Sequence, residues 1–192
     1  MITIPELLWD RLLDEFARIV LPVERVAYLD GLRIGADGVV TTVTIPDADL
    51  HPGYYDVSAA AMSQAGQHFR QHGLTRLAQV HTHGGPGCGH SLRDDSAAYS
   101  QANGSVSIVL PDHATTRPLP TDGAVHVRRQ NGWVLLGPPD AKAAVRLVPS
   151  LLDYRSPQWT QSTIDIQVTS TDGWSRWIKR LLPPWSSRSR QK

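Results

Sequence analysis

The sequence predicts an α/β fold, in which a mixed β-sheet flanked by helices forms a single domain that is followed by a C-terminal extension. Hydrophobic patterns of helical and strand period follow one another in the order helix, strands, helix, strand, helix, strands. With 192 residues, 41% hydrophobic and 19% charged, the chain can bury a core and is too apolar to be wholly disordered. A helical bundle or an all-β barrel would not show this mixture.

An amphipathic helix is expected first, over residues 4–20. Thr3 and Glu6 form a capping-box pattern, and Pro5 suits the first helical turn. The expected apolar stripe consists of Leu8, Leu12, Phe16 and Ile19. Two strands are expected next, over residues 24–34 and 38–45, around a turn that contains Gly38.

A second helix is expected over residues 57–72. Asp56 or Ser58 can serve as its N-cap, and Gly73 can end it. The later elements are a buried strand, a glycine-rich loop, a helix capped by Ser91, another strand and a hairpin. In the same order they cover residues 74–82, 84–87, 91–102, 105–110, and 124–129 with 133–136.

The domain is expected to end near residue 150, because the periodicity fades and prolines recur after Gly137. The remaining 151–192 form the extension, which ends in a basic tail. It carries one apolar helical face, made of Trp174, Trp177, Ile178, Leu181 and Leu182. This face could dock a partner protein, lie on an anionic membrane surface or pack on the protein's own core.

Composition excludes several classes of protein. Nineteen basic and 18 acidic residues give a net charge of +1, which argues against binding nucleic acid through its phosphates. No apolar run approaches the ~20 residues of a transmembrane helix, and the acidic start does not resemble a signal peptide, so a cytoplasmic protein is expected. The single cysteine, Cys88, excludes an internal disulfide and a multi-cysteine zinc finger. Any metal site must use mainly His, Asp and Glu.

The most informative stretch is VHTHGGPGCGHSLRDD, residues 80–95. His81 and His83 lie two apart at the end of an expected strand, so both imidazoles point to one face. A glycine-rich loop then leads to Ser91 and to Asp94 in the first turn of a helix. Two imidazoles and a carboxylate are a normal ligand set for zinc with an open fourth position, where a water can be acidified.

A base is also needed to take the proton of that water. The chain has three glutamates, and two of them, Glu6 and Glu15, lie in the N-terminal helix, where exposed acids are ordinary. Glu24 stands at the start of an otherwise apolar strand and is the candidate base. The alternative is that Glu24 is a solvated residue at the edge of the strand.

The pattern H-x-H-x7-S-x-x-D would arise by chance in roughly 0.002 of chains of this composition. Together with Glu24, it resembles the JAMM motif of the JAB/MPN metalloprotease family, and the likeness covers about residues 5–136. Among these proteins it is most similar to bacterial members encoded beside ubiquitin-like proteins. One departure is Gly84, since a proline often follows the second histidine in the family.

The resemblance implies a zinc-dependent isopeptidase or peptidase that cleaves after the C-terminal glycine of a ubiquitin-like protein. By position, His81, His83 and Asp94 would bind Zn²⁺, Glu24 would deprotonate the water, and Ser91 would stabilise the developing oxyanion. The implied partners are the ubiquitin-like protein, its conjugates, and E1-like and E2-like enzymes of the same operon, with no nucleic acid. Such a pathway could serve antiphage defence.

Other readings stay open at this point. A hydrolase of a small amide or of a sulfur-carrier adduct would use the same five residues, whereas a metal-free MPN scaffold would only bind partners. Four residues near the motif also have alternative roles. Asp95 could replace Asp94 as a ligand, His90 could approach the metal, His113 could line the cleft, and Cys88 could be a ligand or a nucleophile, although a bystander thiol is favoured.

Overall fold

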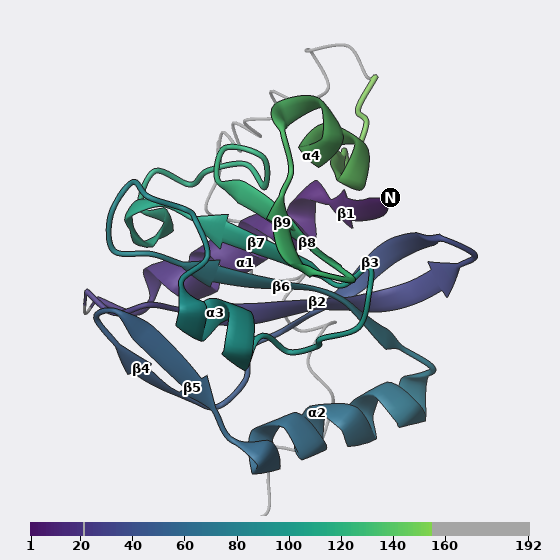
Figure 1. The fold of residues 1–192 in the computed structure, drawn as a ribbon. Helices are drawn as coiled ribbons and strands as arrows, with labels where there is room; N and C mark the ends of the chain where they lie inside the picture. Colours follow the sequence, from purple (N-terminus) through teal and green to yellow (C-terminus); the bar gives the residue numbers. More distant parts are fainter. Residues whose placement is uncertain (21, 155–192) are drawn as a thin grey trace, which may run out of the picture. The chain divides into compact units, whose positions relative to one another are not determined.

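The computed structural model of the protein describes residues 1–20 and 22–154. Among these residues, a mixed sheet of eight strands runs in the order β10-β1-β3-β2-β6-β7-β8-β9 (Figure 1). The strands are β1 (Ile2–Pro5), β2 (Val26–Ile34), β3 (Asp37–Thr44), β6 (Thr75–Thr82), β7 (Val106–Leu110), β8 (Ala124–Arg129), β9 (Gly132–Leu135) and β10 (Val145–Val148). Because helices flank this sheet, the predicted α/β class is confirmed.

The two faces of the sheet are covered differently. Helix α1 (Glu6–Ala17) buries Trp9 and Leu12 against one face, in the main hydrophobic core that also contains Leu77. A smaller cluster, centred on Tyr28 of β2, packs against residues of a short hairpin and of helix α2 (Ala59–His72). In Figure 1, α1 lies behind the central strands, and helix α3 (Leu92–Ala97) lies in front of them.

The N-terminal prediction is correct in its centre and wrong at both ends. Residues 2–5 form strand β1 instead of the first helical turn, because Ile2 and Ile4 alternate into the core and pair with β10 and β3. The capping box of Thr3 and Glu6 is absent, since Pro5 takes the N-cap position without a side-chain hydrogen bond. The helix then ends at Ala17 instead of residue 20.

The third predicted helix begins where expected and is shorter. Ser91 caps α3, as predicted, but the helix ends at Ala97 and not at residue 102. The Tyr99 backbone N–H donates to the Gln79 side-chain oxygen at 3.1 Å. The chain after Ala97 therefore bonds to the sheet instead of continuing the helix.

Four further elements were not predicted: the two strands of a hairpin, a helix and a later strand. The hairpin of β4 (Ala48–His51) and β5 (Tyr54–Val57) lies between β3 and α2, where no element was predicted. Helix α4 (Pro138–Ala144) and strand β10 follow the point where the hydrophobic period fades. Prolines at the start of α4 occupy the first helical turn, where a missing N–H costs nothing.

The other predicted elements are present, with small shifts in their bounds. Ser58, one of the two proposed caps, accepts a hydrogen bond at the start of α2, and Gly73 ends it with φ of 64°. One compact unit comprises residues 1–152. The apolar face predicted around Trp174 and Trp177 lies outside the described residues.

Two glycines, one in the sheet and one in α2, allow a matched test of how closely their neighbours pack. A Cβ on Gly31, beside the irregularity in β2, would lie 2.0 Å from the Val39 carbonyl oxygen. Gly31→Ala is therefore expected to lower the free energy of unfolding by about 1–3 kcal/mol. Gly66→Ala, inside α2, meets only ordinary contacts and is expected to raise it by roughly 0.5–1 kcal/mol. Urea denaturation measures both, and equal effects of the two changes would contradict this account.

Candidate metal centre

The antiparallel pairing of β2 with β6 brings Glu24 to the two histidines. Val26 lies opposite His81 in this ladder, so the same register continued past the end of β2 sets Glu24 opposite His83. The continuation is held by two hydrogen bonds, since Thr82 N–H donates to Arg25 O at 3.0 Å and Arg25 N–H donates to the Thr82 side-chain Oγ1 at 3.0 Å. Glu24 is only 6% exposed, although it stands just before the strand and not within it.

A capping box orients the carboxylate of Asp94. The Ser91 side chain accepts from the Asp94 backbone N–H at 3.1 Å, and the Ser91 backbone N–H donates to Asp94 Oδ2 at 2.7 Å. The first bond fixes the backbone of Asp94 and the second holds its Oδ2, so the carboxylate is oriented toward the end of β6. The Ser91 side chain itself is exposed.

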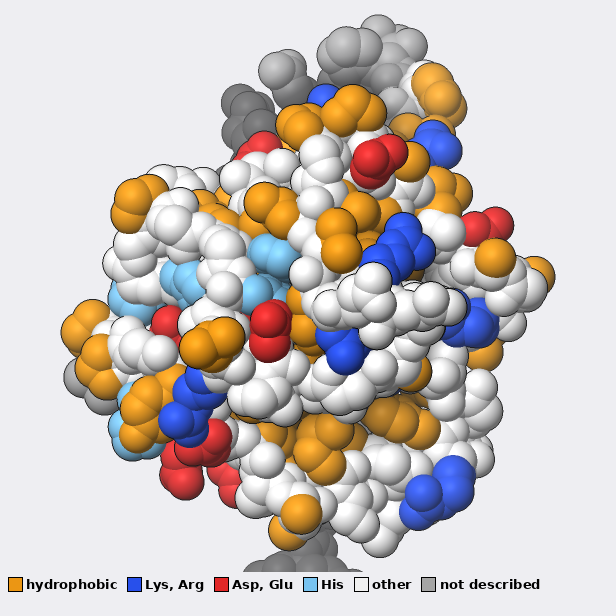
Figure 2. All heavy atoms as spheres, in the orientation of Figure 1, with side chains coloured by type: hydrophobic (Ala, Val, Ile, Leu, Met, Phe, Trp, Pro, Cys, Tyr) orange, Lys and Arg blue, Asp and Glu red, His pale blue; other side chains and the backbone are white. Residues whose placement is uncertain are grey.

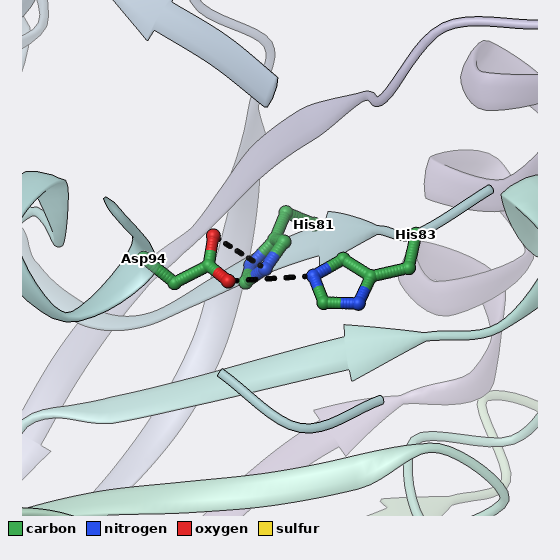
Figure 3. A group of neighbouring side chains, drawn as sticks. All are labelled: His81, His83 and Asp94. Carbon is green, nitrogen blue, oxygen red and sulfur yellow. Dashed lines mark ion pairs between the residues drawn. The ribbon is translucent and has the colours of Figure 1, made fainter. Parts of the chain in front are cut away.

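His81, His83 and Asp94 converge as Figure 3 shows, with the carboxylate pointing at both imidazole rings. Asp94 Oδ1 lies 3.4 Å from His81 Nε2, and Asp94 Oδ2 lies 3.4 Å from His83 Nε2. One candidate ligand atom from each residue lies within 4.8 Å of the others. In the space-filling view, histidine side chains gather beside acidic ones on this face of the molecule (Figure 2).

Charge interactions in this group favour an ionised carboxylate. Burial raises the pKa of Asp94, but the contacts with His81 and His83 and the Ser91 N–H outweigh burial, so this pKa falls below its usual range. Burial lowers the pKa of His81, whereas contact with Asp94 raises it, and burial is the larger of the two effects. The Asp94 hydrogen bond raises the pKa of His83.

The three side chains fit a zinc ion in their chemistry. His81 Nε2 is buried and has no hydrogen-bond partner within the described part of the chain, so this donor atom is available. His83 Nδ1 lies 2.8 Å from the Gly87 carbonyl, which can only accept, so Nδ1 carries the proton and Nε2 keeps its lone pair. In their neutral forms, two imidazoles together with a carboxylate are a set that zinc accepts in a site with one open position.

The Glu24 carboxyl group is electrostatically part of the same site. Burial raises its pKa to about 7, with His83 lowering it and Asp94 raising it further. A carboxyl group with a pKa near neutrality can both accept and release a proton. The solvated-edge alternative for Glu24 does not match its burial.

Two of the alternative residues, Asp95 and His90, bond to each other and not to the three converging side chains. Asp95 points to His90, with its Oδ1 at 2.9 Å from His90 Nδ1, and is not among the three converging side chains. The other ring nitrogen of His90 lies 3.0 Å from Ser107 Oγ. Both ring nitrogens of His90 therefore have partners other than the candidate site.

A side chain at Gly84 would have little room. A Cβ at this position would lie 3.2 Å from His113 Nε2, closer than ordinary contact. Asp112, His113 and Ala114 all have positive φ, between 48° and 60°, in a strained turn that holds the His113 ring beside the loop. His113 thus borders the end of β6.

Cys88 is half-buried, and its thiol donates to the Pro86 carbonyl at 3.6 Å. Burial and the charge of Asp112 raise the pKa of this thiol. A raised pKa disfavours the nucleophilic thiolate, which agrees with the favoured bystander reading.

Sequence analysis missed several polar residues behind the site. Gln79 Nε2 donates to Tyr55 Oη at 2.6 Å and lies 3.5 Å from His81 Nδ1. Tyr55 belongs to the unpredicted β4–β5 hairpin, so no local signal could place it here. His126 on β8 stacks on His90 with ring centroids 3.9 Å apart, and the period of two sets it on the opposite face of the sheet from the core residues Val125 and Val127.

His126 gives a pH-dependent prediction. Burial lowers its pKa to about 4, with the charges of His90 and His81 lowering it further. Between the ordinary histidine pKa of about 6.5 and pH 4, the unfolded chain binds a proton here that the folded protein does not, so stability falls as pH falls. Between pH 7 and pH 4 the wild type should lose about 3 kcal/mol more than His126→Phe. Urea denaturation at both pH values, in chelator, measures the difference, and equal losses would contradict it.

Comparisons with known proteins establish a shared fold and do not assign the chain to a family. No protein-family model and no curated protein matches the sequence. A solution structure of a protein from Desulfitobacterium hafniense is similar at 21% identity, with a TM-score of 0.61, over 79% of this chain and 95% of that one. A crystal structure of a JAB1/MPN domain protein from Archaeoglobus fulgidus aligns at 14% identity, with a TM-score of 0.43, over 77% and 97%. The first likeness shows a shared fold.

None of the helices over residues 1–20 and 22–154 is both long enough and apolar enough to cross a bilayer.

Proposed function

We propose that this chain is a zinc-dependent hydrolase of the JAB/MPN type, which cleaves the amide bond after the C-terminal glycine of a ubiquitin-like protein. The observation that carries the proposal is the convergence of His81, His83 and Asp94 at the end of β6, with buried Glu24 opposite His83. A buried carboxyl group beside three metal-binding side chains is the arrangement that hydrolysis of an amide by an activated water requires.

In this proposal, His81, His83 and Asp94 hold the ion. Bound zinc is a Lewis acid that acidifies a water molecule in its open position. Asp94 is kept ionised by its histidine partners and aimed by the Ser91 N–H, so it offers a charged oxygen without reorganisation. The Gly87 carbonyl fixes the ring of His83 through its Nδ1.

Glu24 moves the proton. Its pKa of about 7 in the metal-free protein allows the carboxylate to accept a proton from water and return it to the leaving amine. Ser91 accepts the cap bond through Oγ, so its hydroxyl hydrogen remains available to the developing oxyanion. Both groups lie beside the converging ligands without belonging to them.

The substrate class rests on the resemblance of the motif to JAB/MPN peptidases encoded beside ubiquitin-like proteins. We propose that the partners are a ubiquitin-like protein and its conjugates, with the E1-like and E2-like enzymes that make them, in the cytoplasm. The bond cleaved joins the C-terminal glycine to a lysine amine or to a C-terminal extension.

The test combines metal content with cleavage. Purified protein is expected to hold one zinc per chain and to cleave a fusion whose ubiquitin-like part ends in glycine. Chelation should stop cleavage, and added zinc should restore it. Zinc binding without cleavage of any such fusion would rule out the proposed substrate class, and small amides would then be tested as substrates. A protein that neither binds zinc nor cleaves would be a scaffold.

A further inference from the structure

His90 ends the glycine-rich loop that leads to α3. Its loop contains Gly84, Gly85, Gly87 and Gly89, and glycine loses more backbone entropy on ordering than any other residue. The His90 side chain is nevertheless only 5% exposed. It is therefore the point where this loop is fixed to the body of the protein.

Both ring nitrogens of His90 are engaged. Nδ1 lies 2.9 Å from Asp95 Oδ1 on α3, and a carboxylate can only accept, so Nδ1 carries a hydrogen. Nε2 lies 3.0 Å from Ser107 Oγ on β7, and in the neutral ring this nitrogen accepts the serine hydroxyl hydrogen. One imidazole thus connects the first turn of α3 to the sheet.

The faces and edges of the ring are packed as well. His126 of β8 stacks on it with an interplanar angle of 20°, and Trp133 of β9 meets it edge to face with centroids 5.1 Å apart. Since contacts come from α3, β7, β8 and β9, rotation of the ring would break several of them together. The orientation of His90 is fixed by this packing.

The position of His90 in the chain makes it important for the candidate site. The next residue is Ser91, whose N–H and Oγ orient Asp94 through the capping box. Helix α3 has only six residues, and an isolated helix of that length is not stable, so contacts with the rest of the fold must set its orientation. The bond from His90 to Asp95 supplies such a contact next to Asp94.

We propose that His90 is a positioning residue. It connects the N-terminus of α3 to strands β7 and β8 and thereby orients Asp94 toward His81 and His83. This inference rests on the proposed metal centre. Outer partners that orient metal ligands typically contribute 10- to 100-fold in metal affinity. A loss of affinity of about this size is therefore expected when the contacts of the His90 ring are removed.

The experiment is a titration of the metal-free full chain with Co²⁺, followed by its visible absorption bands, with thermal unfolding as the check on folding. His90→Ala should weaken Co²⁺ binding by about 10- to 100-fold and change the spectrum. His90→Asn, whose amide can replace the Nδ1 donor to Asp95, should recover most of the affinity. Asp47→Ala, which removes an exposed charge elsewhere, should bind as the wild type does.

A second pair of variants covers the case in which His90→Ala does not fold. Asp95→Ala removes the acceptor and should weaken Co²⁺ binding, whereas Asp95→Asn keeps an acceptor oxygen and should stay close to the wild type. Loss in both Asp95 variants alike would overturn the inference, because charge and not the hydrogen bond would then matter. Unchanged affinity and spectrum in folded His90→Ala would also overturn it. A wild type that binds no Co²⁺ would instead refute the metal centre itself.

Discussion

Glu24→Gln is expected to lower the rate of amide cleavage by about 100- to 10,000-fold while the protein still binds one zinc. Glutamine has the size of glutamate and cannot take up a proton from water at neutral pH. The side chain is buried before β2, opposite His83 and outside the group of three ligands, so the metal should be retained. Cleavage of a ubiquitin-like fusion and zinc content of the same preparation measure the two effects.

Glu15→Gln is the matched control for this change. Glu15 lies in α1 and forms surface ion pairs with Arg11 and Arg18, whose loss has little effect on stability. Wild-type cleavage by this variant, beside loss in Glu24→Gln, would assign the base to Glu24. Full activity of Glu24→Gln would show that another group takes the proton.

Asp94→Asn is expected to weaken zinc binding by more than about 100-fold, a larger effect than the loss of an outer partner brings. The change removes the charged oxygen that faces His81 and His83. It keeps an amide oxygen that can still accept from the Ser91 N–H, so the cap and the helix should remain. Competition with a chromogenic chelator measures the affinity, and circular dichroism measures the fold.

The neighbouring acid gives the comparison for Asp94. Asp95→Asn has the same chemical change one residue further along, on a carboxylate that faces His90 instead of the three-residue group. Its zinc affinity should remain near that of the wild type. Similar losses in the two variants would mean that overall negative charge near α3, and not a ligand oxygen, governs metal binding.

Much of the candidate site could be predicted from the sequence because its parts are local. His81 lies on β6 and His83 directly follows its last residue, so the period of two fixes their relative direction, and Asp94 follows Ser91 at capping-box spacing. Glu24 is the exception, since its meeting with His83 depends on the register between β2 and β6. The scarcity of glutamate in the chain singled it out instead.

The missed elements depend on partners that are distant in sequence. Strand β1 has only four residues, too few for the alternation of Ile2 and Ile4 to identify a strand, so pairing with β10 and β3 decides its conformation. The β4–β5 hairpin has one buried side chain, Tyr55, and its apolar contacts come from β2 and α2. Periodicity within such short segments cannot show these contacts.

The pairing of β1 with β10 has a consequence for how the chain folds. These strands lie near opposite ends of the described sequence, so their contact closes a loop that includes almost the whole sheet. During synthesis, β3 can pair with β1 early, but the other edge of β1 stays open until β10 emerges. An open strand edge is a template for intermolecular pairing, so this edge of β1 is exposed to such pairing until β10 has been synthesised and covers it.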